Sequence, residues 1–272
     1  TYSAEAVVTN GENVGAVEGQ VVAGKTLEVT YVYTEVTGDV VVHYVDTEGN
    51  VIAEDKEDTK GASLNAKYDT TDNKPEKIEK SGIVYYLTEK ALKDGSKPET
   101  GDVVEGKTEV TYVYEKAGSV IVNYQTEDGT PLVGVDPAGA NVASGAKDTV
   151  DGRPGSAYDT SDNGMKPNRI TTAEGKVYEL VPASTKGDET GTVESGQTKE
   201  VTYVYKEVKG NVVVHYTDEA GNKIAEDAKD TTDGSISTPY DTSDNGMKPE
   251  RITTPEGKVY QLVPTATQGA ET

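Results

Sequence analysis

Pairs of aspartates three positions apart are the side chains best placed to do chemistry in this sequence. They lie in a motif that occurs three times, Tyr-Asp-Thr-x-Asp-Asn, as Asp69/Asp72, Asp159/Asp162 and Asp241/Asp244. Carboxylates at this spacing in a turn could hold Ca²⁺, a hard cation that prefers six to eight oxygen ligands. The same residue types also form Asx turns and helix caps by bonding to their own backbone. Because the motif lacks the alternating Asp-x-Asp-x-Asp-Gly loop, we favour the turn. Calcium stays open as the alternative at four residues: Asp159, Asp162, Asp241 and Asp244.

Tyrosine supplies all of the aromatic surface, since the chain has 17 Tyr, no Trp and no Phe. Aromatic faces can stack on sugar rings, which makes tyrosine the candidate for contact with a glycan. Sixteen of the tyrosines recur at equivalent positions along the chain, as expected of a thin core in which each ring is buried and its hydroxyl lies at the boundary. We therefore expect the recurrent tyrosines, Tyr112 among them, in the core. Tyr86 occurs in one copy alone, and we expect it to be exposed and to contact ligand.

No residue combination points to an enzyme. His43 and His215 occupy equivalent positions, but the middle copy has Asn123 there, which argues against a repeated metal ligand or catalytic base. The chain has no cysteine, no Ser-His-Asp constellation and no phosphate-binding loop. No recurrent trio of Lys, Asn and a buried acid indicates an internal isopeptide crosslink. We predict a protein without catalytic activity and without a cofactor, calcium being the open alternative.

These residues are carried by an array of similar units. The stretch Val29-Thr30-Tyr31-Val32-Tyr33 returns at residues 110–114 and 201–205. Each copy is followed by a second apolar run, at residues 40–44, 120–124 and 212–216. The period is about 80 to 92 residues, and such self-similarity indicates a string of small modules.

The repeats divide the chain into four parts. We expect residues 1–36 to be the C-terminal part of a repeat, and 37–117 to be a complete one. Residues 118–208 form a second complete repeat with a loop insertion, and 209–272 form a repeat that lacks its last strand. A shifted register, cut near Gly101 and Gly191, stays open. The joints between repeats are short and not rich in Pro, so we expect stiff connections and an elongated rod.

The periodicity predicts strands. Leu27, Val29 and Tyr31 alternate with polar residues, and this period-two pattern of β-branched and aromatic residues is typical of a half-buried strand. Gly49 indicates a hairpin turn, with an outgoing strand at residues 51–53. Pro167 allows one short helical turn at residues 166–170. The fold class is therefore all-β or β-dominated α+β.

Charge limits the partners. Lys plus Arg is 26 against 48 for Asp plus Glu, a formal net charge of −22. A surface this acidic repels nucleic acid and anionic lipid, and it favours a soluble monomer. No run of 18 or more apolar residues is present, so we expect no membrane insertion. The chain opens directly on repeat sequence, which suggests an excerpt of something longer.

The order of the repeated motifs resembles the MucBP (mucin-binding protein) repeat of Gram-positive cell-wall-anchored surface proteins, above all the streptococcal versions. The motifs are Val-x-Val-x-Tyr, a turn with Gly, Tyr-Asp-Thr, Val-Tyr-x-Leu, Gly-x-Glu-Thr-Gly and Val-Thr-Tyr-Val-Tyr, and they cover essentially the whole chain. The resemblance implies β-grasp-like (ubiquitin-like) modules in an extracellular protein. It also implies a host partner, mucin or another glycoprotein.

Two functions remain open at this stage. One is a stalk of a surface adhesin that also binds mucin or another glycoprotein. The other is a purely structural spacer that projects a separate N-terminal binding domain from the cell wall. The stretch from Gly129 to Tyr158 is about ten residues longer than its counterparts, and surface loops tolerate such insertions at little cost. We therefore expect the insertion to have little effect on the module.

Overall fold

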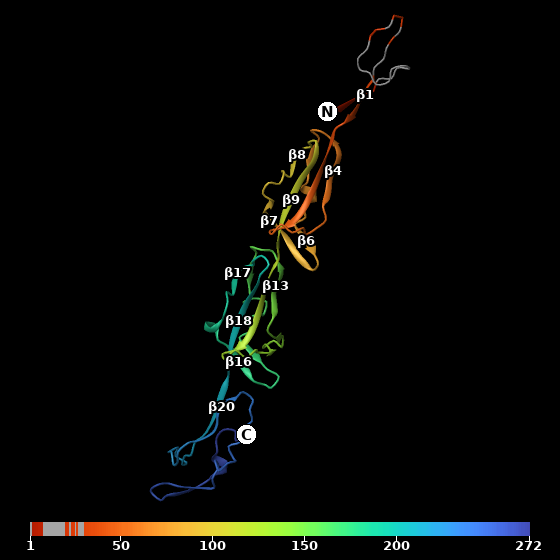
Figure 1. The fold of residues 1–272 in the computed structure, drawn as a ribbon. Helices are drawn as coiled ribbons and strands as arrows, with labels where there is room; N and C mark the ends of the chain where they lie inside the picture. The colour runs from red at the N-terminus through yellow and green to blue at the C-terminus, as the bar shows by residue number, and fades with distance from the viewer. Residues whose placement is uncertain (1, 8–19, 22, 25, 27–29) are drawn as a thin grey trace. The chain divides into compact units, whose positions relative to one another are not determined.

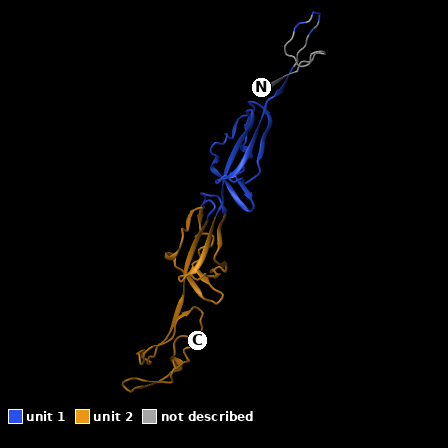
Figure 2. Ribbon diagram, in the orientation of Figure 1, with its two compact units in different colours: residues 1–118, 151–156, 194–197 blue, residues 119–150, 157–193, 198–272 orange. Residues whose placement is uncertain are grey.

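The computed structural model describes residues 2–7, 20–21, 23–24, 26 and 30–272 (Figure 1). Val29 and half of the expected partial repeat at residues 1–36 lie outside the described residues. The chain forms two compact units (Figure 2). Unit 1 comprises residues 1–118, 151–156 and 194–197, and unit 2 comprises residues 119–150, 157–193 and 198–272.

Regular structure in the described residues is almost entirely β-strand, which confirms the predicted fold class at that level. The exceptions are three short 3-10 turns: η1 (Thr71–Asn73), η2 (Pro182–Ser184) and η3 (Pro264–Ala266). The helical turn expected at residues 166–170 is wrong, because strand β15 (Arg169–Thr171) already begins there. Lys166 precedes a proline and is therefore biased towards extended backbone. No helix in the described part of the chain is long and apolar enough to cross a membrane.

Unit 1 is built on a five-stranded sheet. Its strands, in spatial order, are β4 (Lys56–Ser63), β3 (Thr37–Asp46), β9 (Gly106–Lys116), β7 (Ile83–Leu92) and β6 (Lys77–Lys80). The central pair, β3 and β9, is parallel, with Val42 opposite Val110 and Tyr44 opposite Tyr112. Two antiparallel pairs complete the unit: β5 (Lys67–Asp69) with β8 (Thr100–Asp102), and β1 (Tyr2–Val7) with β2 (Thr30–Glu35).

Unit 2 contains a seven-stranded sheet with the same parallel centre. Its order is β12 (Asn141–Val142), β11 (Gly134–Val135), β15, β16 (Val177–Leu180), β18 (Thr198–Glu207), β10 (Gly118–Thr126) and β13 (Ala146–Gly152). β10 and β18 are parallel, with Tyr124 opposite Tyr203. Three antiparallel pairs follow: β14 (Ala157–Asp159) with β17 (Thr190–Thr192), β19 (Lys209–Val214) with β20 (Ala228–Ser235), and β21 (Arg251–Thr253) with β22 (Val259–Gln261).

The predicted alternation of strand faces is confirmed in the two complete repeats. Val110, Tyr112 and Tyr114 on β9 are fully buried, and so are Tyr203 and Tyr205 on β18. Their side chains share one face because successive strand residues point to opposite sides of the sheet. The equivalent tyrosines of the first copy differ, since Tyr31 and Tyr33 are 50% and 53% exposed.

The insertion of the second repeat is part of the sheet, so the expectation of an inconsequential surface loop is wrong. Strands β11 and β12 extend the sheet beyond β15, and Val142 enters the core at 5% exposure. The approach is close at Gly134, where a Cβ would lie 2.3 Å from the carbonyl oxygen of Thr171. Only glycine therefore allows β11 to lie against β15.

The turn after β3 follows the prediction, but the outgoing strand does not. Gly49 has a φ of +90°, and its N–H donates to the Asp46 carbonyl. The Asp46 carboxylate accepts the N–H groups of Glu48 and Asn50. Val51 makes one bridge to Val45, and the continuous strand starts later, at Lys56. The Asp46 bonds close the turn as far as Asn50, and Ile52 still donates its N–H to the Tyr44 carbonyl before the chain leaves β3.

Candidate functional site

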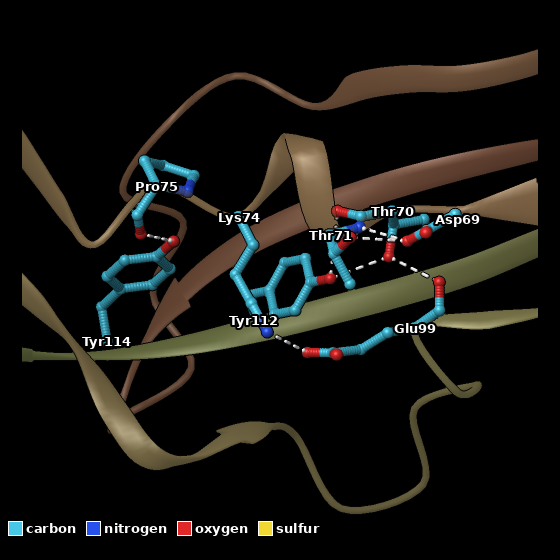
Figure 3. Close-up of polar contacts among 8 residues, drawn as sticks. All are labelled: Asp69, Thr70, Thr71, Lys74, Pro75, Glu99, Tyr112 and Tyr114. Carbon is cyan, nitrogen blue, oxygen red and sulfur yellow. Dashed lines mark hydrogen bonds and ion pairs between the residues drawn. The ribbon is translucent and has the colours of Figure 1, made fainter.

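A cluster of buried tyrosines is the feature that the repeated motifs build in unit 1 (Figure 3). The Tyr112 hydroxyl donates to the Thr70 carbonyl at 3.1 Å and lies 2.8 Å from the Thr70 hydroxyl oxygen. Thr70 in turn donates its N–H and its hydroxyl to the carbonyl oxygen of Glu99. The Tyr114 hydroxyl donates to the Pro75 carbonyl at 2.7 Å. Each ring of the last strand is thus tied to the loop between β5 and β6.

A lysine and a glutamate close this cluster from outside. Lys74 Nζ lies 2.7 Å from Glu99 Oε1, and both side chains are about three-quarters buried, at 25% and 26% exposure. The ammonium also lies 5.8 Å from the centroid of the Tyr112 ring. A cation over an aromatic face adds electrostatic attraction to the ion pair. The pair was not predicted from the sequence, although Lys-Pro and Glu-Thr recur in each of the three repeats after residue 36.

The last glycine of the Gly-x-Glu-Thr-Gly motif has a packing role. Tyr68 on β5 lies opposite Gly101 on β8, and a Cβ on Gly101 would lie 2.9 Å from the Tyr68 hydroxyl oxygen. Tyr158 and Gly191 repeat the arrangement in unit 2. The ring therefore covers the glycine, and its hydroxyl reaches a carbonyl beyond it, that of Pro98 or of Asp188. The motif is explained by close packing and needs no ligand.

Unit 2 repeats the cluster with the same partners. Tyr203 lies 2.9 Å from the Thr160 hydroxyl, and Tyr205 donates to the Pro167 carbonyl at 2.8 Å. Lys166 pairs with Glu189 at 2.7 Å and lies 5.4 Å from the Tyr203 ring centroid. The recurrence of these contacts in both units indicates that the same structural arrangement is used twice.

Burial controls the ionisation of these tyrosines. It raises the pKa of Tyr112 and of Tyr124 to about 12, and it also raises the pKa of Tyr114 and Tyr205. The phenolate form is disfavoured because a charge loses its hydration inside the core. The hydroxyls therefore remain protonated donors to backbone carbonyls. These hydroxyls stabilise the fold, and the buried rings are not accessible to a sugar.

The predicted aspartate sites form turns. The Asp159 carboxylate accepts the N–H and the hydroxyl of Ser161, at 2.8 and 2.6 Å, and the hydroxyl contact is the main reason that its pKa lies below the usual value. Asp162 accepts the side-chain amide of Asn163 at 2.6 Å. Asp241 and Asp244 make the same bonds with Ser243 and Asn245. Within the described residues, no three acidic, His or Cys side chains are arranged to hold a metal. This geometry accounts for the motif as an Asx turn, and calcium binding stays a prediction to be tested.

Tyr86 is engaged within unit 1. Its hydroxyl donates to the Asp151 carbonyl at 3.0 Å, and the Arg153 guanidinium lies 5.9 Å from the ring centroid. Arg153 also pairs with Glu76 at 2.7 Å. The ring is partly exposed. The sequence did not indicate its contact with Arg153. Its predicted role in ligand binding stays a prediction, and any ligand would have to share the ring with Arg153.

The two histidines and Asn123 are bridging residues. His43 Nδ1 lies 2.7 Å from Asp55 Oδ1, and His215 Nδ1 lies 3.1 Å from Asp227 Oδ2. Asn123 accepts the N–H of Gly145 and donates to Glu200. Whether His or Asn occupies this position, its side chain therefore links a strand to the segment that follows it. The expectation that no repeated catalytic base stands here stays a prediction.

The insertion lines one shallow depression in unit 2, with a volume of about 440 Å³. Its walls include Asp136, Asn141 and Ser144 on the insertion side and Asn163 and Met165 on the other. The lining is mixed polar and apolar. Such a surface can make hydrogen bonds to a polar partner, but it lacks the enclosure of a typical small-molecule site.

The fold and these clusters define a class before any relative is considered: tandem β-modules held by buried tyrosines, without a catalytic constellation in the described residues. The MucBP domain family matches residues 39–115, 119–206 and 211–272. The chain therefore belongs to the MucBP family, as its motif order predicts.

A curated relative and two solved structures are similar to the chain. The muramidase-released protein of Streptococcus suis is 40% identical over 271 residues, which cover 90% of this chain and 20% of that protein. The chain thus spans about a fifth of that relative's length. Streptococcal High Identity Repeats in Tandem (SHIRT) domains 3–4 from a cell surface protein match at 11% identity, over 63% of this chain and 99% of theirs, with a TM-score of 0.23. The type 2 repeat of the mucus binding protein MUB from Lactobacillus reuteri matches at 13% identity, over 63% and 100%, with a TM-score of 0.15. Both scores are too low to support a structural argument.

Proposed function

We propose that this chain is a non-enzymatic repeat region of a bacterial surface adhesin, an extended extracellular stalk that also binds mucin or another host glycoprotein. Anchorage to the cell wall would come through a region outside this chain. One observation supports the stalk. Two repeats bury equivalent tyrosines with equivalent partners: Tyr112 contacts the Thr70 hydroxyl, and Tyr203 contacts the Thr160 hydroxyl. A module whose aromatic side chains are buried in its own core does not need a ligand to be stable, and it can therefore be repeated as a spacer.

We also propose that each module is a β-grasp-like variant. The support is the mixed sheet, in which the first and last strands of the repeat, β3 and β9, lie parallel at the centre. The helix of a β-grasp fold would correspond to the stretch between β5 and β6, where unit 1 has only the 3-10 turn η1.

The glycoprotein-binding part rests on family membership and on the places where the repeats differ. Tyr86 and the β11–β12 hairpin each occur in a single repeat among the described residues. Because the net charge is −22, sialylated mucin should be repelled at long range, and the repulsion should weaken with salt. The partner best suited to this surface is a neutral stretch of glycoprotein.

Binding to immobilised mucin, before and after enzymatic removal of sialic acid, tests the proposal. We expect stronger binding after the removal, and a smaller difference between the two surfaces at high salt. Tyr86→Ala should weaken the binding if the ring contacts the partner, and Glu179→Ala, at the equivalent position of the next repeat, is the matched control. If the chain bound neither the untreated nor the desialylated mucin, the result would favour the alternative, a purely structural spacer for a separate binding domain.

The stalk is tested by small-angle scattering. A compact globule of this length has a radius of gyration of about 19 Å. Compact modules strung end to end should instead give more than roughly 28 Å. This expectation rests on the short joints of the sequence, and a value close to the globular one would contradict the stalk.

A further inference from the structure

Two Asn-Gly pairs form equivalent exposed turns in unit 2. Asn163 and Gly164 have φ values of +49° and +76°, and the Met165 N–H donates to the Asp162 carbonyl at 2.9 Å. Asn245 and Gly246 have the same two angles, and Met247 donates to Asp244 at 2.9 Å. Positive φ at both central residues defines a type I′ turn, for which Asn-Gly is the preferred pair. The dipeptide therefore has a structural reason to be present, and its chemistry is a second consequence.

We propose that Asn163 and Asn245 are sites of spontaneous backbone-directed deamidation in the folded protein. The Gly164 amide nitrogen forms a bond to Cγ of Asn163, the bond from Cγ to Nδ2 breaks, and the amide proton leaves with Nδ2 as ammonia. The product is a five-membered succinimide. Water then opens the ring at one of its two carbonyls, which yields aspartate or isoaspartate. No oxidant, metal or cofactor is required, and water is the only co-reactant.

Access and sterics favour these two positions. Both asparagines and both following glycines are exposed. A Cβ at Gly164 or Gly246 would meet no atom within 4 Å, so the turn has open space around the attacking nitrogen. One backbone hydrogen bond across each turn must break before the asparagine leaves positive φ for the reactive geometry. Exposed turns of this kind open at low free-energy cost.

The chain contains matched asparagines that lack one or more of these conditions. Asn65 is exposed and has a φ of +68°, but Ala66 follows it and its Cβ hinders the attack. Asn73 is the counterpart of Asn163 in unit 1, is partly buried, and donates to both Asp58 and Asp72. Lys74 follows it in place of Gly. Among described asparagines, the following glycine occurs only at residues 163 and 245; Asn10, which also precedes a glycine, lies outside them.

The reaction would loosen the tyrosine cluster of the repeat in which it happens. Isoaspartate adds a methylene to the backbone two residues before Met165, whose carbonyl accepts the Tyr124 hydroxyl at 2.8 Å. It also shifts Lys166, which pairs with Glu189. Either product places a new carboxylate beside Asp162 in place of the amide that donates to it. In the third repeat, Met247 accepts the Tyr216 hydroxyl at 2.7 Å, so the same loss is expected there.

The test is ageing of the full chain in mildly alkaline buffer, followed by peptide mapping and an isoaspartate-specific methyltransferase assay. We expect Asn163 and Asn245 to react at least about tenfold faster than Asn65 and Asn73, which corresponds to about 1.4 kcal/mol of activation free energy. Gly164→Ala should slow the reaction at Asn163 and leave Asn245 as an internal reference. Equal rates at Asn65 and Asn163, or reaction only in denaturant, would overturn the proposal.

A second measurement follows the consequence in the same samples. Hydrogen exchange in residues 158–167 should become faster as isoaspartate accumulates, with no change in residues 68–75. Asn163→Gln places the amide one methylene further from the backbone, so it should not age in this way. Faster exchange in aged Asn163→Gln protein would show that the loosening has another cause.

Discussion

Residues 158–167 and 240–249 have the same sequence, Tyr-Asp-Thr-Ser-Asp-Asn-Gly-Met-Lys-Pro, in two different surroundings. Both segments fold alike locally. Ser161 bonds to Asp159 as Ser243 bonds to Asp241, and Lys248 pairs with Glu271 as Lys166 pairs with Glu189. The identical segments therefore form the same turn, and in each the lysine pairs with a glutamate 23 residues further along the chain.

The burial of the two segments differs. Tyr158 is 6% exposed and Ile170 is fully buried, whereas their counterparts Tyr240 and Ile252 are partly exposed. Residues 118–208 contain β18, whose Tyr203 lies against Thr160. Residues 209–272 contain no Val-Thr-Tyr-Val-Tyr strand. The turn and the ion pair thus form in both repeats, and the core is closed only in the repeat that has the long-range parallel strand.

The largest expected effect is the loss of a tyrosine from that strand. Tyr203→Ala should cost about 3–5 kcal/mol of unfolding free energy, as aromatic truncations in cores do. Tyr112→Ala should cost as much in unit 1, and each loss should be local because repeats contact only their neighbours. Hydrogen exchange resolved by segment is the measurement. Tyr216→Ala, in residues 209–272, is the control and should cost far less. No loss at Tyr112 or Tyr203 would mean that these rings do not hold the core.

The second largest effect should be the unfolding at alkaline pH of the two repeats whose tyrosines are buried. Burial raises the folded-state pKa of Tyr112 and Tyr124 to about 12, above the usual value of about 10. A raised pKa stabilises the fold fully below about pH 10, and this stabilisation is lost as the pH rises towards 12. A pKa shift of this size corresponds to roughly 2 to 3 kcal/mol for each tyrosine. Tyrosinate absorbance and circular dichroism should change together in this range. Tyr124→Phe should reduce the loss, and ionisation well before unfolding would contradict the prediction.

The same comparison explains how much the sequence could predict. Alternation identified the inward face of β9 and β18, because a period of two fixes which side chains face the core. It could not distinguish Tyr33 from Tyr114, which have the same local pattern, because the difference is the presence of a parallel partner strand far away in sequence. The pairing of β11 with β15 was missed for a related reason. Nothing local to Gly134 shows that Thr171 will lie against it.

The site was predicted to a similar extent. The recurrence of Asp159 and Asp162 indicated a turn, and the structure places both in one. The recurrent Lys166 and Glu189 received no role, although their spacing is regular, because an ion pair over a tyrosine depends on three segments meeting. Tyr86 was recognised as unusual, but its contact with Arg153 joins residues 67 positions apart and leaves no signal near either one.

A smaller effect should follow from the loss of one hydroxyl. Tyr205→Phe keeps the ring but leaves the buried Pro167 carbonyl without its donor, which should cost about 1–2 kcal/mol. Tyr216→Phe removes another bond from a tyrosine hydroxyl to a backbone carbonyl, that of Met247, in the more exposed repeat, where water can replace it. Denaturant titration should therefore show a clear shift for the first variant and almost none for the second. Equal shifts would mean that burial does not strengthen the bond.

The smallest expected effect is that of calcium. If Asp159 and Asp162 held Ca²⁺, the ion would stabilise the folded state by about 2.7 kcal/mol at 100 times its Kd, a shift of several degrees for a unit of this size. The Asp159 carboxylate already accepts two bonds from Ser161, and Asp162 accepts Asn163. We therefore expect Ca²⁺ and Mg²⁺ at equal ionic strength to give the same small shift by screening the acidic surface. Asp159→Ala should lose stability to the same extent with and without calcium, because it breaks a turn. Asp241→Ala supplies the matched change in the more exposed repeat. A calcium-selective shift of several degrees, abolished by Asp159→Ala, would replace the Asx turn with a repeated metal site that stiffens each module.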